Sequence, residues 1–173
     1  GFGMGGDEGH MTFEDFKPAF DKVAKAGYPC TTHAGEHFGP ETILDAIEKL
    51  PVSRIGHGVR ISENENAVKE IIKKGIVLEI CPGSNVSLGV YKNYSEHPFP
   101  YLRNCGCKVT LNSDDPPFFH TNIGKEYENA HTNFGLSIDN LLDITRTAIN
   151  AAFIKDDEKK RLQAKVDSWK KSG

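Results

Sequence analysis

The segment Thr32-His33-Ala34-Gly35-Glu36 combines a metal-capable imidazole with a carboxyl group three residues later. A histidine nitrogen can hold a metal ion, and a glutamate can move a proton as a general acid or base. The apolar run 26–31 predicts a short buried strand before this segment, and the run from Pro40 predicts a helix after it. We therefore expect both groups at the carboxyl end of a strand, where α/β folds bind their ligands. Gly35 is interpreted as room for a ligand to approach the backbone closely.

Polar side chains also follow the other apolar runs that predict strands. His57 follows the run that starts at Val52, Ser84-Asn85 follows the run 76–81, and Asp114-Asp115 follows the run 107–112. In a parallel barrel the carboxyl ends of all strands converge on one mouth. We therefore expect these groups to share a single site with the segment 32–36.

The residue types at this shared mouth form a hydrolytic set. His33 and Asp114 are candidate nitrogen and oxygen ligands for a borderline metal such as zinc. Glu36 and His57 are the candidate general acid and base, and Asp115 is left to bind the substrate. From the residues alone, the set predicts a metal-dependent α/β enzyme.

The elements that must position these groups alternate regularly along the chain, as is typical of βα units in a parallel sheet. Strands are predicted over 2–6, 26–31, 52–58, 76–81 and 107–112. Helices are predicted over 12–24, 40–50, 62–75, 97–104, 121–134, 139–153 and 157–171, the third opened by a capping box at Ser62. The segment 82–85 is predicted to be a loop.

The fold class follows from where the polar residues lie. Five strands can complete a doubly wound sheet, but the chain has neither a G-x-G-x-x-G motif nor a P-loop. Polar residues after each strand favour part of a (β/α)8 barrel, whose site is built from many strand ends. With 173 residues the chain has the size of one domain. We predict one partial barrel over residues 1–173, with the helices of 121–173 packing on it.

Composition excludes several classes of partner. The 21 basic and 24 acidic residues give a net charge of −3, so neither nucleic acid nor a membrane surface is expected as a partner. No apolar run approaches the roughly 20 residues of a membrane span. The four cysteines are expected to be reduced thiols of a cytoplasmic protein. Five histidines are expected to face solvent: His10, His37, His97, His120 and His131.

Five motifs resemble the adenosine deaminase family in order and spacing. They are Gly5-Gly6-Asp7-Glu8, Thr32-His33-Ala34-Gly35-Glu36, Arg54-Ile55-Gly56-His57-Gly58, Cys81-Pro82-Gly83-Ser84-Asn85 and Leu111-Asn112-Ser113-Asp114-Asp115-Pro116. The likeness is to the bacterial type and covers most of the chain. It implies a zinc-dependent barrel of the metal-dependent amidohydrolase kind, of which the strands here would be about the fourth to the eighth. It also implies the deamination of adenosine to inosine and ammonia.

The resemblance assigns a role to each matching position. His33 and Asp114 match zinc ligands. Glu36 matches the acid that protonates purine N1, and His57 matches the histidine that positions and deprotonates the metal-bound water. Asp115 matches the carboxylate that meets N7. Gly6 matches the backbone group that meets N3.

One departure from the family pattern is large. The family has an H-x-H pair that supplies two more zinc ligands, and this sequence contains no H-x-H. Catalytic zinc usually has three protein ligands, so two are too few. We therefore expect the C-terminal part of a deaminase whose first βα units lie elsewhere, with the missing half of the barrel as a partner. By itself it should bind zinc weakly and turn over little.

Two alternatives stay open at this point. The substrate can be adenine or another 6-aminopurine compound instead of adenosine. The chain can also be a non-catalytic half-barrel that assembles with itself or with another chain.

Overall fold

The five strands form one parallel sheet whose spatial order is the same as their order in the chain. The computed structural model describes residues 1–10 and 12–172. Within them the strands pair in the order β1 (Phe2–Met4), β2 (Cys30–Ala34), β3 (Val52–His57), β4 (Val77–Ile80) and β5 (Lys108–Leu111). A doubly wound sheet reverses its strand order at a switch point, whereas a barrel adds each new strand beside the last. The sheet is therefore part of a (β/α)8 barrel.

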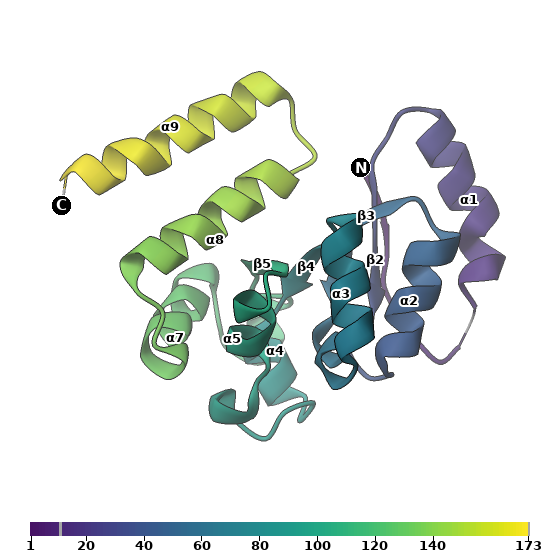
Figure 1. Cartoon of the computed structure of the whole chain (residues 1–173), viewed down its shortest axis with the longest axis horizontal. Coiled ribbons are helices and arrows are strands. Elements are labelled where there is room, and N and C mark those ends of the chain that lie inside the picture. The colour runs from purple at the N-terminus through teal and green to yellow at the C-terminus, as the bar shows by residue number, and fades with distance from the viewer. Residues whose placement is uncertain (11, 173) are drawn as a thin grey trace.

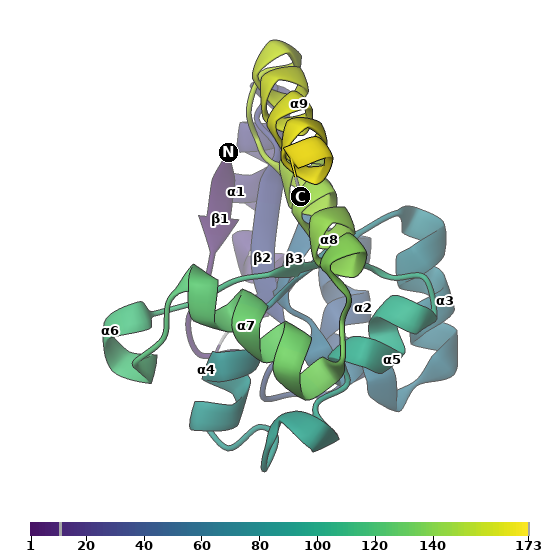
Figure 2. The same cartoon turned by 90° about the vertical axis from the view of Figure 1, so that its left-hand side faces the viewer.

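Helices follow the strands as the alternation predicts. Their bounds are α1 Phe13–Lys25, α2 Pro40–Lys49, α3 Glu65–Lys74, α4 Pro82–Ser87, α5 Phe99–Asn104, α6 Pro116–Phe119, α7 Ile123–Phe134, α8 Ile138–Ala151 and α9 Asp156–Ser172, with single 3-10 turns at Val59–Glu63 and Tyr94–Glu96. Helices α1, α2 and α3 lie side by side along one side of the sheet (Figure 1). Helices α8 and α9 run together and project beyond the sheet (Figures 1 and 2).

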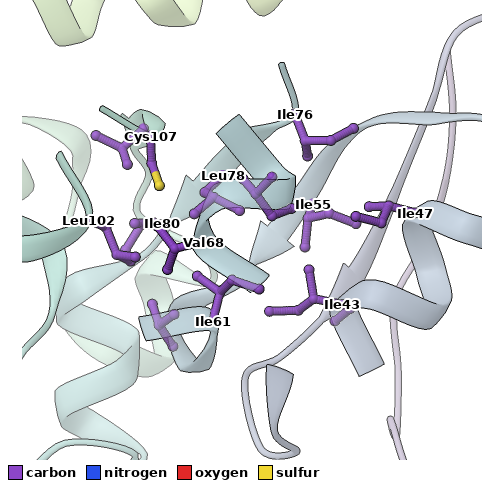
Figure 3. Packing of buried hydrophobic residues seen from close by; sticks show 14 of the residues in the cluster. Ile43, Ile47, Ile55, Ile61, Val68, Ile76, Leu78, Ile80, Leu102 and Cys107 are labelled. Atoms are coloured by element: carbon purple, nitrogen blue, oxygen red, sulfur yellow. The ribbon is translucent and has the colours of Figure 1, made fainter. Parts of the chain in front are cut away.

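The core lies between the sheet and the helices that cover it. Ile43 and Ile47 of α2 and Val68 of α3 meet Ile55 of β3 and Leu78 of β4, and all five are buried (Figure 3). Each fully buried side chain of this kind contributes about 1.5–3 kcal/mol by leaving water. This packing anchors β3 and β4, whose carboxyl ends carry polar residues of the predicted site.

The chain has more exposed surface than a compact protein of its mass. The chain exposes 9482 Å², whereas a compact protein of 19.1 kDa exposes about 8,400 Å². Strand β1 pairs only with β2, and β5 pairs only with β4, among the residues described. Both edges of the sheet are therefore available for pairing with further strands.

The second strand begins later than its sequence predicts. Residues 26 and 27 close α1, because their N–H groups donate to carbonyls of its last turn, and the strand starts at Cys30. His33 consequently lies within β2, not after it. Thr31 and His33 alternate with buried neighbours, so both side chains face the open side of the sheet.

The predicted start of α3 and the predicted loop 82–85 also differ from the structure. The N-cap of α3 is Asn64, whose Oδ1 accepts from the N–H groups of Asn66 and Ala67, while the Ser62 hydroxyl donates to the Val59 carbonyl. Ser62 is thus inside the preceding 3-10 turn. The segment 82–85, predicted as a loop, forms the first residues of α4, where a proline in the first turn suits a helix.

The prediction that His97 faces solvent is wrong. Its side chain is 4% exposed and is enclosed by the rings of Tyr91 and Phe134, with centroid distances of 4.9 and 5.7 Å. The other four histidines of that group are exposed. No helix in the described ranges is both long and apolar enough to cross a membrane.

Candidate active site

His33 is held so that its Nε2 is the nitrogen free for a ligand. Its Nδ1 lies 3.1 Å from the carbonyl oxygen of Met4 on the neighbouring strand. A carbonyl can only accept, so Nδ1 carries the hydrogen and Nε2 keeps its lone pair. A Cβ at Gly5 or Gly56 would lie 3.0 or 3.1 Å from the ring. The imidazole therefore lies between two glycines, where any side chain would crowd it.

The backbone has an unusual conformation at His57 and at Asp114, near the ends of β3 and β5. Their φ angles are 58° and 53°, in the left-handed region that residues other than glycine rarely adopt. Strained positions of this kind gather at functional sites. The bend places His57 Nε2 3.7 Å from Asp114 Oδ2, and the His57 ring centroid lies 5.1 Å from that of His33.

His57 is neutral at ordinary pH. Its side chain is 2% exposed. Burial, and then the nearby His33, lower the pKa of His57 to about 4, although Asp114 opposes the shift. Its Nε2 also lies 3.5 Å from Glu36 Oε2. A neutral imidazole thus stands between two carboxyl groups.

Glu36 presents a carboxyl oxygen with no partner among the described residues. Oε1 is buried and makes no hydrogen bond, while Oε2 lies 3.5 Å from Nε2 of both His37 and His57. Burial raises the pKa of Glu36, His37 opposes that shift, and Asp114 adds to it. A carboxyl group in this setting keeps its proton more readily than a solvated one, as a general acid requires.

The loop after β2 is shaped by Glu8, not by space for a ligand at Gly35. Glu8 Oε2 accepts from the backbone N–H groups of Glu36, His37 and Phe38 at 3.2, 2.7 and 3.1 Å. Gly35 has a φ of 69°, and a Cβ there would collide with Ile43. The glycine is therefore required by packing and backbone conformation, which corrects its interpretation as a ligand approach.

One cavity is lined by three of the six predicted site residues. It has a volume of about 500 Å³ at the carboxyl ends of the strands and includes His33, His57 and Asp114 in its lining. Gly6 lines a neighbouring cavity of about 190 Å³ that shares His33. Gly6 has a φ of 138° and open space where a Cβ would stand. Asp115 is exposed at the start of α6 and lines neither cavity.

Two sets of donors can be considered for a metal. The pair predicted from the sequence is His33 and Asp114. Within the described residues, the potential ligand atoms of His57, Cys81 and Asp114 lie within 4.8 Å of one another. The Cys81 thiol donates to the Glu79 carbonyl, and burial raises its pKa well above the ordinary value, which disfavours the thiolate that zinc binds. His33, with its lone pair free on Nε2, suits the chemistry of zinc better.

Three residues that support this site had no role predicted from the sequence. Glu8 orders the backbone of the loop that carries Glu36. Asn85 is fully buried beside His57, with its Nδ2 3.3 Å from His57 Nδ1. His97 lies behind Asn85, with its Nε2 3.2 Å from Asn85 Oδ1. Glu8 and Asn85 stand in the motifs quoted above, but nothing in their spacing indicates these contacts.

The fold and the site together define part of a (β/α)8 barrel with histidine and carboxyl groups gathered at the carboxyl ends of its strands, and one family of known proteins matches this chain. The family model described as adenosine deaminase matches residues 1–169. The chain belongs to the adenosine deaminase family.

Three similar proteins show which members of the family resemble this chain. An adenine deaminase of Mesorhizobium japonicum is 47% identical over 167 residues, which are 96% of this chain and 52% of that protein. The crystal structure of an adenine deaminase from Arthrobacter aurescens matches with a TM-score of 0.94 and 29% identity, over 99% of this chain and 52% of that one. An amidohydrolase from Burkholderia ambifaria with bound zinc matches with a TM-score of 0.87 and 26% identity, over 96% and 47%. The chain spans about half the length of these proteins.

Proposed function

We propose that this chain is the C-terminal part of a zinc-dependent barrel enzyme that converts adenine and water into hypoxanthine and ammonia. The observation that carries the proposal is the convergence of Glu36, His57 and Asp114, whose side-chain atoms lie 3.5 and 3.7 Å apart around the neutral imidazole. The similarity to adenine deaminases supports adenine over the adenosine that the family resemblance led us to expect.

The chain's own residues perform the proton and positioning steps. His57 orients the attacking water toward C6 of the ring. Glu36, through the buried oxygen that has no other partner among the described residues, donates a proton to N1. Protonation of N1 makes C6 more electrophilic, so the oxygen of the water bonds to C6. One proton of the water restores the Glu36 acid and the other passes to the 6-amino group, so the C6–N bond breaks, ammonia leaves and hypoxanthine keeps the hydrogen on N1. Gly6 and Asp115 are proposed to meet N3 and N7.

Zinc would be held by Nε2 of His33 and a carboxylate oxygen of Asp114. When bound, it lowers the pKa of a water molecule from about 15.7 to about 7. Two further ligands are proposed to come from the rest of the barrel, which would add strands to β1 and β5. The domain assignment stays a proposal too: one partial barrel over 1–173, with the helices of 121–173 against it. The four free cysteines support a cytoplasmic location.

A comparison of substrates tests the proposed activity. The zinc-loaded intact barrel is incubated separately with adenine, adenosine and AMP, and ammonia release is measured. We expect kcat/KM for adenine to exceed that for adenosine at least about tenfold, since adenosine adds a ribose that an adenine pocket must exclude. A preference for adenosine or AMP would overturn the substrate. Ammonia from none of the three would favour the non-catalytic half-barrel.

Replacement of the proposed acid tests its role. Glu36→Gln keeps the size of the side chain but cannot donate a proton as a carboxylic acid does, so we expect kcat for adenine to fall about 10²–10⁴-fold. Zinc content should not change, because Glu36 is not a proposed ligand. Glu48→Gln, at an exposed position of α2, is the matched control and should keep the wild-type rate. A Glu36→Gln rate within threefold of wild type would remove Glu36 from the mechanism.

A further inference from the structure

A buried chain of hydrogen bonds runs from the start of α5 to the back of His57. The Phe99 N–H donates to His97 Nδ1 at 3.1 Å, His97 Nε2 lies 3.2 Å from Asn85 Oδ1, and Asn85 Nδ2 lies 3.3 Å from His57 Nδ1. The side chains of His97, Asn85 and His57 are 4%, 0% and 2% exposed, so water does not compete for these contacts. Each of these ring nitrogens and amide atoms therefore acts either as a donor or as an acceptor toward its one partner in the chain.

The direction of every bond in this chain follows from its first member. A backbone N–H can only donate, so His97 Nδ1 is an acceptor and carries no hydrogen. Burial lowers the pKa of His97 to about 3, so the ring is neutral and its hydrogen is on Nε2. That hydrogen needs an acceptor, which sets the Asn85 oxygen toward His97 and the Asn85 NH₂ toward His57.

We propose that His97 and Asn85 are positioning residues that hold His57 in the tautomer with its hydrogen on Nε2. The Asn85 NH₂ leaves His57 Nδ1 as an acceptor, so the hydrogen of the neutral ring stands on the nitrogen that faces Glu36 and Asp114. This inference rests on the proposed function for its catalytic meaning, but the tautomer itself can be measured without any substrate.

The tautomer changes what His57 offers to the reaction. With the hydrogen on Nε2, the imidazole presents an N–H group to the oxygen that it holds, so it orients the water by donating a hydrogen bond. The family resemblance instead implies a base, which would need a lone pair at that atom. The distinction matters because a histidine held in the wrong tautomer can lose several orders of magnitude in rate with its geometry intact.

Replacement of the Asn85 amide by a carboxylate tests the inference. In Asn85→Asp the carboxylate has acceptors only, so it should draw the His57 hydrogen to Nδ1 and leave a lone pair on Nε2. We expect the ¹⁵N-histidine spectrum of the zinc-loaded intact barrel to show His57 with hydrogen on Nε2 in the wild type and on Nδ1 in the variant. The value of kcat for adenine should fall about 100-fold with little change in KM.

His97 variants separate positioning from folding. His97→Gln retains an NH₂ group that can donate to Asn85, so the His57 spectrum should stay as in the wild type and the rate should fall only a few-fold. His97→Leu fills the space without a donor, so Asn85 can turn over and the His57 signals should report a mixture of tautomers. Circular dichroism and zinc content show that each variant is folded and loaded.

The outcomes distinguish this inference from the proposed function. His57 with its hydrogen on Nδ1 in the wild type would overturn the inference, as would an unchanged His57 spectrum and rate in Asn85→Asp. If the spectra behave as expected but the wild type releases no ammonia from adenine, the hydrogen-bond chain stands and the proposed function fails.

Discussion

Two glycines define the space in which His33 can hold a ligand. Gly5 on one side and Gly56 on the other leave the imidazole ring between them, and the Met4 carbonyl directs its Nε2 outward. A side chain at either glycine would have to displace the ring by a few tenths of an ångström. Metal ligation is sensitive to such shifts, because the groups around a ligating histidine set its orientation.

Gly56→Ala tests this packing. The added methyl group would meet the His33 ring at 3.1 Å, so the ring must move. We expect zinc affinity, measured by competition with a chelator, to fall roughly tenfold or more, while circular dichroism stays unchanged. Ser53→Ala, at an exposed position of the same strand, is the control and should retain zinc. Equal affinity in Gly56→Ala and wild type would show that the ring is not confined.

The burial of His97 has a consequence for stability in acid. The folded pKa of about 3 lies below the unfolded value of about 6.5, so below pH 6.5 the unfolded chain binds the extra proton first. Stability from this group is therefore complete above pH 6.5. It is lost as pH falls toward 3, at up to about 1.4 kcal/mol per pH unit.

Urea unfolding between pH 6 and pH 4 measures this loss. His97→Gln lacks the titrating group, so its free energy of unfolding should be lower at pH 7 but fall less steeply with acid than that of the wild type. The groups against His97, which are Asn85, Tyr91, Phe99 and Phe134, carry no charge at these pH values. Parallel slopes in the two proteins would contradict the neutral, buried state of His97.

Residue types at strand ends predicted which side chains gather at the site. The burial of individual side chains could not be predicted from the sequence. His33, His57 and Asp114 line one cavity, as their places after or near the ends of strands predicted. His97 was expected in solvent because no local pattern shows that Tyr91 and Phe134 close over it. Such enclosure depends on contacts between segments far apart in the chain, so residue spacing carries no signal for it.

At the scale of elements, the loop between β2 and α2 is the part that carries the proposed acid. Three successive N–H groups of this loop point at one carboxylate oxygen of Glu8, from the segment after β1. Hydrogen bonds to a charged group are each worth about 1.5–3 kcal/mol. The loop conformation thus depends on a residue from another βα unit.

Glu8→Ala should loosen this loop without removing any group of the proposed reaction. We expect faster hydrogen exchange at the amides of residues 36–38 and a fall in kcat of about tenfold, since a misplaced acid loses part of its effect. Glu48→Ala provides the matched control on exposed helix surface. Unchanged exchange at those three amides in Glu8→Ala would contradict the proposed anchoring.

Helices and strands could be predicted well where the periodicity was strong, and their first residues less well. Four of the five strands and the helix from Pro40 lie where the pattern placed them, the second strand being the exception, and Gly75 ends α3 in the left-handed conformation. The start of α3 was misplaced because Ser62 and Asn64 are both good capping residues. Which of them caps depends on the preceding turn, where Ser62 bonds to Val59.

For the whole molecule, the main feature is a parallel sheet with open edges. Strands β1 and β5 remain edges among the residues described, and the cavity between the strand ends is open. Strand order could be predicted from the polar residues after each strand. The proposed substrate could not be predicted from the motifs, because they contain no group that would distinguish adenine from adenosine, and it rests on the similarity to adenine deaminases.

We propose that His33 and Asp114, from β2 and the segment after β5, hold the metal of this site. Crystals of the zinc-loaded intact barrel, measured above and below the zinc absorption edge, locate the ion directly. We predict one anomalous peak within about 2.0–2.2 Å of His33 Nε2 and an Asp114 carboxylate oxygen. A peak ligated by Cys81 and His57 without His33, or no peak in this cavity, would show that His33 and Asp114 do not hold the metal.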